Sequence, residues 1–216
     1  EFKTILGQQE LPCLAIVYAD KEGNILLVDN GLFPNRNENY NWQYIVPGDT
    51  SATLWEPVFM PMENILQVEN PSSGYVFHMN GTGFNSTSDE ENPLPENYNK
   101  TMGYTIRNAS RQLRFKSMIA PYDKLTYQDI KKIKYDQHRQ FPLYTKTIEN
   151  WDDLRHVSPQ EFPSLRDIIE IFSKWTGEAD IHNKQAAIFV LAGNHIAEFT
   201  NNHGIGDRAG SIPEDV

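Results

Sequence analysis

The first part of the chain alternates short apolar runs with turn-forming residues. Residues 13–20 (CLAIVYAD) and 24–30 (NILLVDN) are apolar runs of similar length, and the KEGN segment between them contains a glycine. Two such runs around a glycine-containing turn predict a β-hairpin. Residues 46–65 are rich in proline and aromatic residues, which predicts a long ordered loop packed on its own side chains. Residues 70–80 predict a turn followed by one more strand.

Residues 81–101 have a different character, because they are small, polar and interrupted by proline. Composition alone predicts a solvated surface loop here. Taken together, residues 1–101 are predicted to be a β-rich segment with long loops.

Helical periodicity begins after this loop. The next predicted helix opens at Thr126, with Asp129 placed three positions later as in a capping box. Residues 164–175 carry apolar side chains at helical spacing, and Gly177 is well placed to end that helix. Residues 184–199 are mostly apolar and predict a buried helix. The apolar positions of the first three helices are Ile106, Leu113, Met118 and Ile119; Ile130, Ile133 and Tyr135; and Leu165, Ile168, Ile169, Phe172 and Trp175.

The order of these elements, strands first and helices afterwards, defines the fold class. Residues 102–216 form a predicted helical segment, and no strand–helix–strand alternation is present. This order predicts an α+β fold. The 216 residues suit one large domain or a piece of a larger one. Residue 1 is a glutamate, so we expect the chain to be a cut piece or a processed product.

Charge and cysteine content exclude several classes of function. The formal net charge is −10, which argues against nucleic acid as a partner. No apolar stretch reaches the roughly 20 residues of a membrane span. The single cysteine, Cys13, excludes an internal disulfide and a CxxC site, and its apolar run predicts a small buried side chain. The histidines, at 78, 138, 156, 182, 195 and 203, show no ligand spacing and predict surface or structural roles.

Common catalytic motifs are absent from the sequence. There is no G-x-S-x-G elbow, phosphate-binding loop, dinucleotide fingerprint or H-E-x-x-H. Four Asn-x-Ser/Thr sequons occur, but they cluster in a region rich in Asn and Thr, where chance explains them unless the host is a eukaryotic secretor. They lie at Asn80, Asn85, Asn99 and Asn108.

A series of short strings in a fixed order carries the most information. The strings are Y18-A-D-K-E-G-N-I25, G31-L-F-P-N-R36, V46-P-G48, W55, N70-P-S-S-G-Y-V76 leading to N80, R107-N-A-S-R111, L125-T-x-x-D129, W175-T-G177 and A186-A-I-F189. In this order and with these gaps, the chain resembles the large (β) subunit of the penicillin acylase family from about Leu11 to Phe189. The resemblance implies a fragment of the four-layer αββα sandwich of N-terminal-nucleophile hydrolases.

The family chemistry gives Asn80 a candidate role. Members self-cleave to expose a serine whose own α-amine acts as the base when the serine attacks an amide carbonyl. An asparagine side chain helps to hold the resulting oxyanion, and such donors are worth about 3–4 kcal/mol. The resemblance implies that Asn80 is this residue. By composition alone, Asn80 before Gly81 is typical of a turn that ends a strand.

Two further site residues follow from the same resemblance. Arg111 matches the family arginine that braces the active-site asparagine or contacts substrate, with Arg107 as the alternative if the register shifts. On composition, Arg111 is equally an exposed helix arginine. Leu14 matches a position that lines the acyl pocket, and a plain core role is the alternative.

The resemblance implies no cofactor for catalysis and a structural calcium ion in the complete protein. By spacing, the backbone carbonyl of Trp42 and the carboxylate of Glu91 are its candidate ligands here, with Asp89 or Glu90 in place of Glu91. Calcium binds oxygen ligands of this kind. The main ligands are expected outside this chain.

The chain departs from the family pattern at three places. W-T-G stands where W-D-G is common, Gly81 follows Asn80 where a second asparagine is frequent, and the 81–101 loop is longer than in compact relatives. The chain also lacks the nucleophile, because the family serine lies well upstream of the Y-A-D hairpin.

The sequence therefore predicts part of an amidohydrolase that splits a linear amide into an acid and an amine. Expected substrates are acylated β-lactams, acyl-homoserine lactones or lipopeptide side chains, and expected partners are the rest of the α and β subunits. The family resemblance implies a periplasmic or secreted parent, and the isolated piece is expected to be inactive. Two alternatives remain open: a carbohydrate- or peptide-binding module using aromatic residues 40–59, and a non-catalytic acylase homologue.

Overall fold

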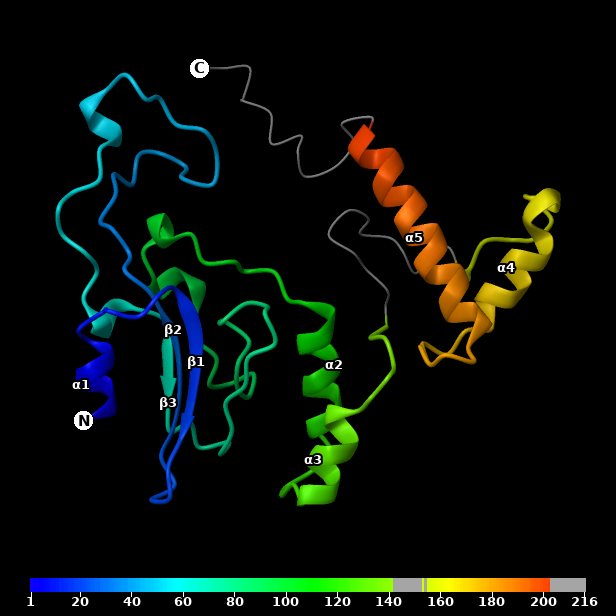
Figure 1. Cartoon of the computed structure of the whole chain (residues 1–216), viewed down its shortest axis with the longest axis horizontal. Helices are drawn as coiled ribbons and strands as arrows, with labels where there is room; N and C mark the ends of the chain where they lie inside the picture. Colours follow the sequence, from blue (N-terminus) through cyan, green and yellow to red (C-terminus); the bar gives the residue numbers. More distant parts are fainter. Residues whose placement is uncertain (142–152, 154, 203–216) are drawn as a thin grey trace. The chain divides into compact units, whose positions relative to one another are not determined.

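The computed structural model describes residues 1–141, 153 and 155–202. The chain divides into two compact units, Glu1–Gln112 and Leu113–Val216, which we describe separately (Figure 1). The predicted α+β class is confirmed, with one small antiparallel sheet and several helices. The first unit extends beyond the compositional boundary after Thr101 because Met102, Tyr104 and Gln112 pack into it.

The predicted hairpin forms the centre of unit 1. Strands β1 (Leu14–Ala19) and β2 (Ile25–Asn30) are antiparallel, and β3 (Gln67–Glu69) pairs with the other edge of β2. Gly23 has a φ of +91°, which the turn requires and which glycine adopts without strain. The side chain of Asp20 accepts a hydrogen bond of 2.8 Å from the Asn24 amide and closes the turn.

Strand β2 is covered on both faces, because successive side chains point to opposite sides of a sheet. Leu26 and Val28 pack with Leu6, Ile65 and Met102 on one side. Leu27 packs with Leu66 and Val68 on the other. The short helix α1 (Phe2–Leu6), which the sequence pattern did not predict, stacks Phe2 on Tyr18 with ring centroids 4.4 Å apart.

Several predictions for unit 1 are wrong. The strand expected after the turn at residues 71–74 is absent, because Phe77 N–H bonds Ser86 O and the Thr87 hydroxyl bonds Tyr75 O in place of a strand ladder. Cys13 is exposed, since it precedes β1 at the edge of the sheet. The 46–65 loop is not packed on its own side chains.

Backbone pairing holds the 46–65 loop instead. Asn35 N–H donates to Val58 O at 3.0 Å and Met60 N–H donates to Phe33 O at 2.8 Å. Trp55 remains 58% exposed while the Arg36 guanidinium lies over its ring. The loop contains the short 3₁₀ helices η1 (Ser51–Thr53) and η2 (Met62–Asn64).

Residues 81–101 are not a solvated loop either. Several of their small polar side chains are buried because they bond to backbone groups: the Ser86 hydroxyl donates to Gly83 O at 2.8 Å, and Asn92 Oδ1 accepts from the amides of Ser86 and Thr87. The segment contains η3 (Pro95–Asn97) and leads into η4 (Lys100–Met102). The buried polar residues are Thr82, Ser86, Thr87 and Thr101.

Helix α2 (Ser110–Ile119) begins in unit 1 and continues into unit 2. It starts later than the predicted apolar position at Ile106 implies, because the preceding Tyr104 packs into the core, where its hydroxyl accepts from Leu66 N–H at 3.0 Å. Ile106 accordingly lies outside the helix and is 71% exposed.

In unit 2, helix α3 (Tyr127–Lys134) has the predicted start. The Thr126 side chain accepts from the Asp129 amide, and the Asp129 carboxylate accepts from the Thr126 amide, so the capping box is confirmed. Its apolar positions are not covered, since Ile130 is 52% exposed. The bridge between His138 and Glu178 then joins residues 137–139 to residues 177–179.

An aromatic cluster forms the core of unit 2. Trp175 is 1% exposed, its ring centroid lies 5.7 Å from that of Phe172 and 5.0 Å from that of Phe189, and its indole N–H donates to Glu178 O at 2.7 Å. Phe141 packs edge-on against Trp175. The predicted third helix is observed as η6 (Pro163–Leu165) followed by α4 (Arg166–Ser173).

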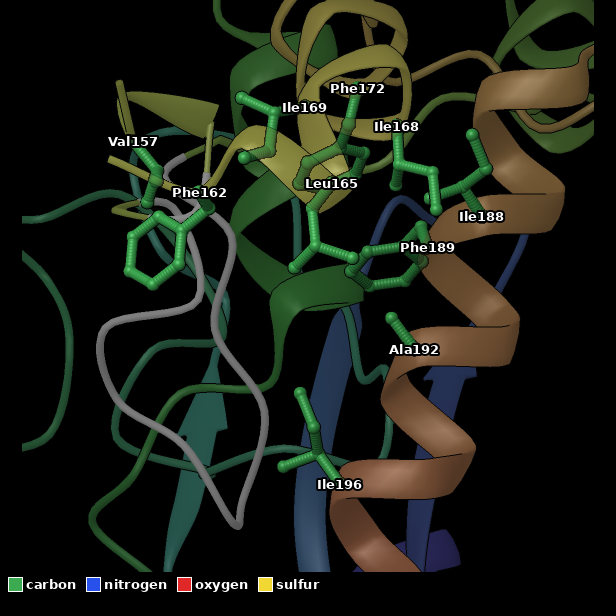
Figure 2. A pocket seen from close by; sticks show the side chains of 10 residues that line it. All are labelled: Val157, Phe162, Leu165, Ile168, Ile169, Phe172, Ile188, Phe189, Ala192 and Ile196. Carbon is green, nitrogen blue, oxygen red and sulfur yellow. The ribbon is translucent and has the colours of Figure 1, made fainter. Parts of the chain in front are cut away.

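Helix α5 (Lys184–Asn202) is not buried all round, contrary to its prediction. Leu191 is 60% exposed and Val190 is 48% exposed, because α5 packs only one side against α4. A wholly apolar-walled groove of about 320 Å³ lies open between the two helices (Figure 2). Among the described residues, no helix is long and apolar enough to cross a membrane.

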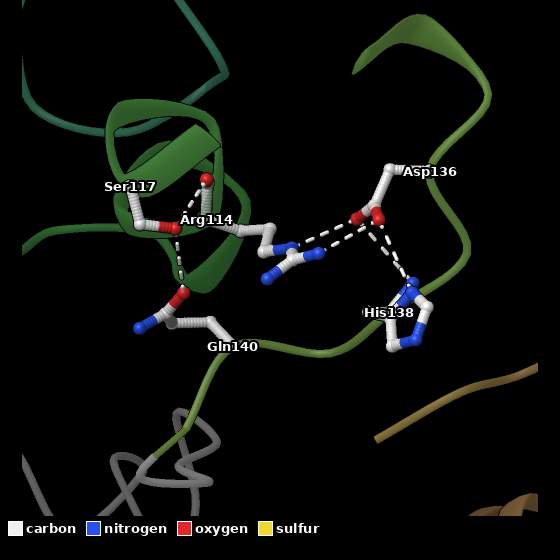
Figure 3. A network of polar contacts seen from close by, with 5 residues as sticks. All are labelled: Arg114, Ser117, Asp136, His138 and Gln140. Carbon is white, nitrogen blue, oxygen red and sulfur yellow. Dashed lines mark hydrogen bonds and ion pairs between the residues drawn. The ribbon is translucent and has the colours of Figure 1, made fainter. Parts of the chain in front are cut away.

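One ion pair fixes the strand-like segment that follows α3. Arg114 donates from Nε and Nη2 to Asp136 at 2.8 and 2.7 Å, and His138 Nδ1 lies 3.2 Å from the same carboxylate (Figure 3). The hydrogen bonds from Arg114 hold the pKa of Asp136 below its usual value. The side chains of Ser117 and Gln140 meet beside this pair at 3.4 Å.

Candidate functional site

Asn80 stands at a tight turn in unit 1 and exposes its side chain. Its φ is +53°, a left-handed conformation that asparagine adopts more readily than most residues. Its backbone N–H points to His78 Nδ1 at 3.4 Å. The turn therefore presents the amide side chain of Asn80 at the surface of unit 1.

Arg111, in the first turn of α2, contacts Asn80 directly. Arg111 Nη2 donates to Asn80 Oδ1 at 3.2 Å. An arginine can only donate, so this bond orients the oxygen of the Asn80 side chain toward Arg111 and leaves the NH₂ group on the opposite side. Within the described residues, Asn80 Nδ2 has no hydrogen-bond partner. The pair thus offers a neutral N–H donor, oriented by a cation, to a ligand.

Side chains from the 86–92 loop anchor the segment before Asn80. Glu91 accepts from the amides of Ser72 and Ser73, the latter at 2.9 Å, and from the Ser88 hydroxyl at 3.1 Å. Hydrogen bonds from Ser73 first, and then from Ser72, lower the pKa of Glu91 to about 2. The Thr87 hydroxyl donates to Tyr75 O at 2.9 Å. The turn at residues 71–74 is therefore fixed by a carboxylate that stays ionised.

Gln112 anchors the segment after Asn80, and sequence reasoning missed it. Its side chain is fully buried, and Nε2 donates to Thr82 O at 2.6 Å and to Asn85 O at 2.5 Å. A buried glutamine is unusual, but nothing in the sequence pattern marks this one.

Leu14 is the first residue of β1 and lies opposite Asn30. It is 42% exposed, so it is not a plain core residue. Next to it in the sheet, Asp29 has its pKa raised by burial, an effect that the nearby His78 opposes. The acyl-pocket role of Leu14 stays a prediction.

The candidate calcium ligands do not form a site in the described part of the chain. Glu91 uses its carboxylate on the turn at residues 71–74, and Trp42 lies in another turn, where its indole N–H donates to Asn37 O at 2.8 Å. No group of three or more His, Cys, Asp or Glu residues that could hold a metal occurs among the described residues. Because the main ligands are expected outside this chain, the calcium roles of Trp42 and Glu91 stay predictions. His203 lies outside the described residues.

Two comparisons with known proteins show the family and the fold. The sequence profile of the family described as penicillin amidase matches residues 1–212. The solved structure of a thermostable penicillin G acylase from Alcaligenes faecalis, in an orthorhombic form, is similar with a TM-score of 0.51 and 22% sequence identity. The match covers 84% of this chain and 31% of that one, so this chain spans less than a third of the relative. At this identity the similarity shows the fold.

Proposed function

Because the chain belongs to the penicillin amidase family, whose members are hydrolases acting on C–N bonds, we propose that it is part of an amidase that cleaves a linear amide. Its share of the fold is a section of an αββα sandwich. The nucleophile is an N-terminal serine outside this chain, exposed by self-cleavage. The substrate belongs to one of three classes of acylated amide, namely acylated β-lactams, acyl-homoserine lactones or lipopeptides.

The hydrogen bond from Arg111 to Asn80 carries this proposal. It turns the Asn80 amide so that Nδ2 is presented as a donor. When the serine oxygen adds to the substrate carbonyl carbon, the carbonyl oxygen gains negative charge. A preoriented neutral donor stabilises that charge in the transition state more than it stabilises the neutral substrate.

Arg111 also contributes its charge. Its guanidinium polarises the Asn80 amide through Oδ1, which strengthens the N–H donor at the far end. The Asn80 side chain separates the Arg111 charge from the reacting atoms. The positive charge therefore does not disturb the α-amine of the serine, which acts as the base. The acyl group would contact Leu14, and the remaining α and β subunit segments would complete the site in a periplasmic or secreted enzyme.

The test is steady-state kinetics of the complete protein on acyl anilides, with wild type compared to Asn80→Ala and Asn80→Asp. The second variant keeps the shape of asparagine and loses the N–H donor. We expect both to lower kcat by about 10²–10³-fold, the effect of removing one oxyanion donor. The 216-residue chain alone should show no turnover.

Asn70 provides the matched control. Like Asn80 it is an exposed asparagine with a left-handed φ, +48°, but its side chain accepts from the Ile25 amide and serves the hairpin. Asn70→Ala should lower stability and leave kcat near the wild-type value. Wild-type turnover in Asn80→Ala would remove the catalytic role, and absence of turnover in the complete wild-type protein would favour a non-catalytic homologue.

A further inference from the structure

Gln112 has every polar atom of its side chain engaged. Besides the two bonds from Nε2 to Thr82 O and Asn85 O, its Oε1 accepts from Ala109 N–H at 3.3 Å. The side chain is fully buried. A buried amide that satisfies two loop carbonyls and one helix-entry amide connects the loop after Asn80 to the start of α2.

Gly81 makes this connection sterically feasible. A Cβ on residue 81 would overlap Gln112 Oε1 and would lie 2.8 Å from Gln112 Cδ and 3.0 Å from Ala109 N. Gly81 is not among the described glycines that have a positive φ. The lack of room for a side chain, and not the backbone conformation, therefore requires glycine at this position. The loop can approach α2 this closely only while residue 81 lacks a side chain.

These contacts run in parallel with the one already assigned. Asn80 and Gly81 are consecutive, and so are Arg111 and Gln112, so the same two stretches of backbone are joined twice. The outer contact, from Arg111 to Asn80, is exposed and single. The inner contact, through Gln112, is buried and has two hydrogen bonds to the loop.

We propose that Gln112, with Gly81, is the positioning element that fixes the distance between the Asn80 turn and α2, and thereby the place of Asn80 Nδ2. This inference rests on the proposed function of Asn80. Gln112 touches no reacting atom. Its buried bonds keep the loop from moving when charge develops on the substrate, and a displacement of about 1 Å at such a donor can cost on the order of 100-fold in rate.

The first test compares Gln112→Ala and Gln112→Glu in the complete protein. Both remove the Nε2 donor, and the second keeps the length of the side chain. We expect kcat to fall on the order of 100-fold while KM changes little, because a misplaced oxyanion donor affects the transition state more than substrate binding. An unchanged kcat in both variants would overturn the proposal.

Gln67 is the matched control. Its Nε2 also donates to two backbone carbonyls, Met62 O at 3.0 Å and Ile65 O at 3.5 Å, but it lies in β3 and does not contact the Asn80 loop. Gln67→Ala should lower the melting temperature without changing kcat. An equal loss of kcat in Gln67→Ala and Gln112→Ala would show a general stability effect and would contradict the positioning role.

A double-mutant cycle separates this proposal from the proposed function. If Gln112 acts through Asn80, Gln112→Ala should cost less than about threefold in kcat once Asn80 is already alanine, since coupled residues are non-additive. The same loss in both backgrounds would overturn the role of Gln112 and leave that of Asn80 intact. Full activity in Asn80→Ala would overturn the function of Asn80 itself.

Gly81→Ala gives an independent result if the Gln112 variants fold poorly. The new methyl group would push the loop from α2 while Gln112 stays in place, so kcat should fall and amide hydrogen exchange at residues 82–86 should rise. In the Gln112→Ala background the same substitution should cost much less, because its main steric partner is gone. Wild-type kcat in Gly81→Ala would contradict the proposal.

Discussion

Each of the two units is stabilised internally by a different kind of interaction. In unit 1, buried polar side chains bond to loop backbone, as Gln112 and Ser86 do. In unit 2, the rings around Trp175 hold the helices through apolar contact, and the groove between α4 and α5 stays open. Hydrogen bonds have strict distances and angles, whereas apolar contact is non-directional.

This difference explains where the candidate site lies. A donor that must meet a developing charge needs its position fixed within a fraction of an ångström, and directional bonds on both sides of Asn80 provide that. Unit 2 fixes helix packing but presents no comparable polar constellation outside the pair of Arg114 and Asp136 in its described residues. Three substitutions test whether the contrast holds.

The largest effect is expected from Trp175→Ala. Removing the centre of the aromatic cluster should destabilise unit 2 by about 3–5 kcal/mol. Hydrogen exchange followed by mass spectrometry should show faster exchange in α4 and α5, with the sheet of unit 1 still protected. The control is Trp55→Ala, because Trp55 is 58% exposed. If β2 loses protection together with α4, the two units are one cooperative structure and the comparison fails.

A pair of glycines gives the next largest difference. Gly177 and Gly23 have nearly the same φ, +93° and +91°, so alanine is strained at both by about 1–2 kcal/mol. Only at Gly177 would the new Cβ meet a neighbour, Phe141 Cε2 at 2.7 Å, whereas Gly23 faces open space. Overpacking should add about 1–3 kcal/mol to the cost of Gly177→Ala. Equal melting temperatures for the two variants would show that the aromatic cluster accommodates the added methyl group at little energetic cost.

The smallest effect is expected at Asp136, and it depends on pH. Hydrogen bonds from Arg114 lower the pKa of Asp136 in the folded protein, so the carboxylate contributes its full stability above the unfolded pKa of about 3.9 and loses it as pH falls below that value. Asp136→Asn should therefore lower stability by about 1–2 kcal/mol at neutral pH, since Arg114 is partly exposed. The deficit should shrink below about pH 4.

The matched measurement uses Asp123→Asn, a substitution at an exposed aspartate of the same unit. Chemical denaturation at pH 7 and at acid pH should show little change for this control. A deficit in Asp136→Asn that stays constant down to pH 2 would contradict the electrostatic explanation.

Local patterns predicted the local structure well. The hairpin with Gly23, the capping box of Thr126 and Asp129, and the apolar stripe that ends at Trp175 all depend on residues near one another in sequence. Such signals are readable because turn conformation, capping and helical periodicity are properties of a few consecutive residues.

Predictions failed where residues far apart in the sequence determine the local structure or the burial of a side chain. The segment at residues 75–79 has strand-like composition, but Ser86 and Thr87 take its hydrogen bonds. Residues 81–101 read as solvated because composition shows neither the bonds within the segment, such as that from Ser86 to Gly83, nor those from Gln112. For the site, family resemblance supplied Asn80 and Arg111, and the fold adds their contact. Gln112 could not be found, since a glutamine in a helix is ordinary until its burial is known.

The close fit between Gly81 and Gln112 also constrains how this sequence can change over generations. A side chain at position 81 has no room while a glutamine occupies position 112, so we expect the two positions to vary together. Relatives that carry a second asparagine in place of Gly81 should have a smaller residue than glutamine in place of Gln112.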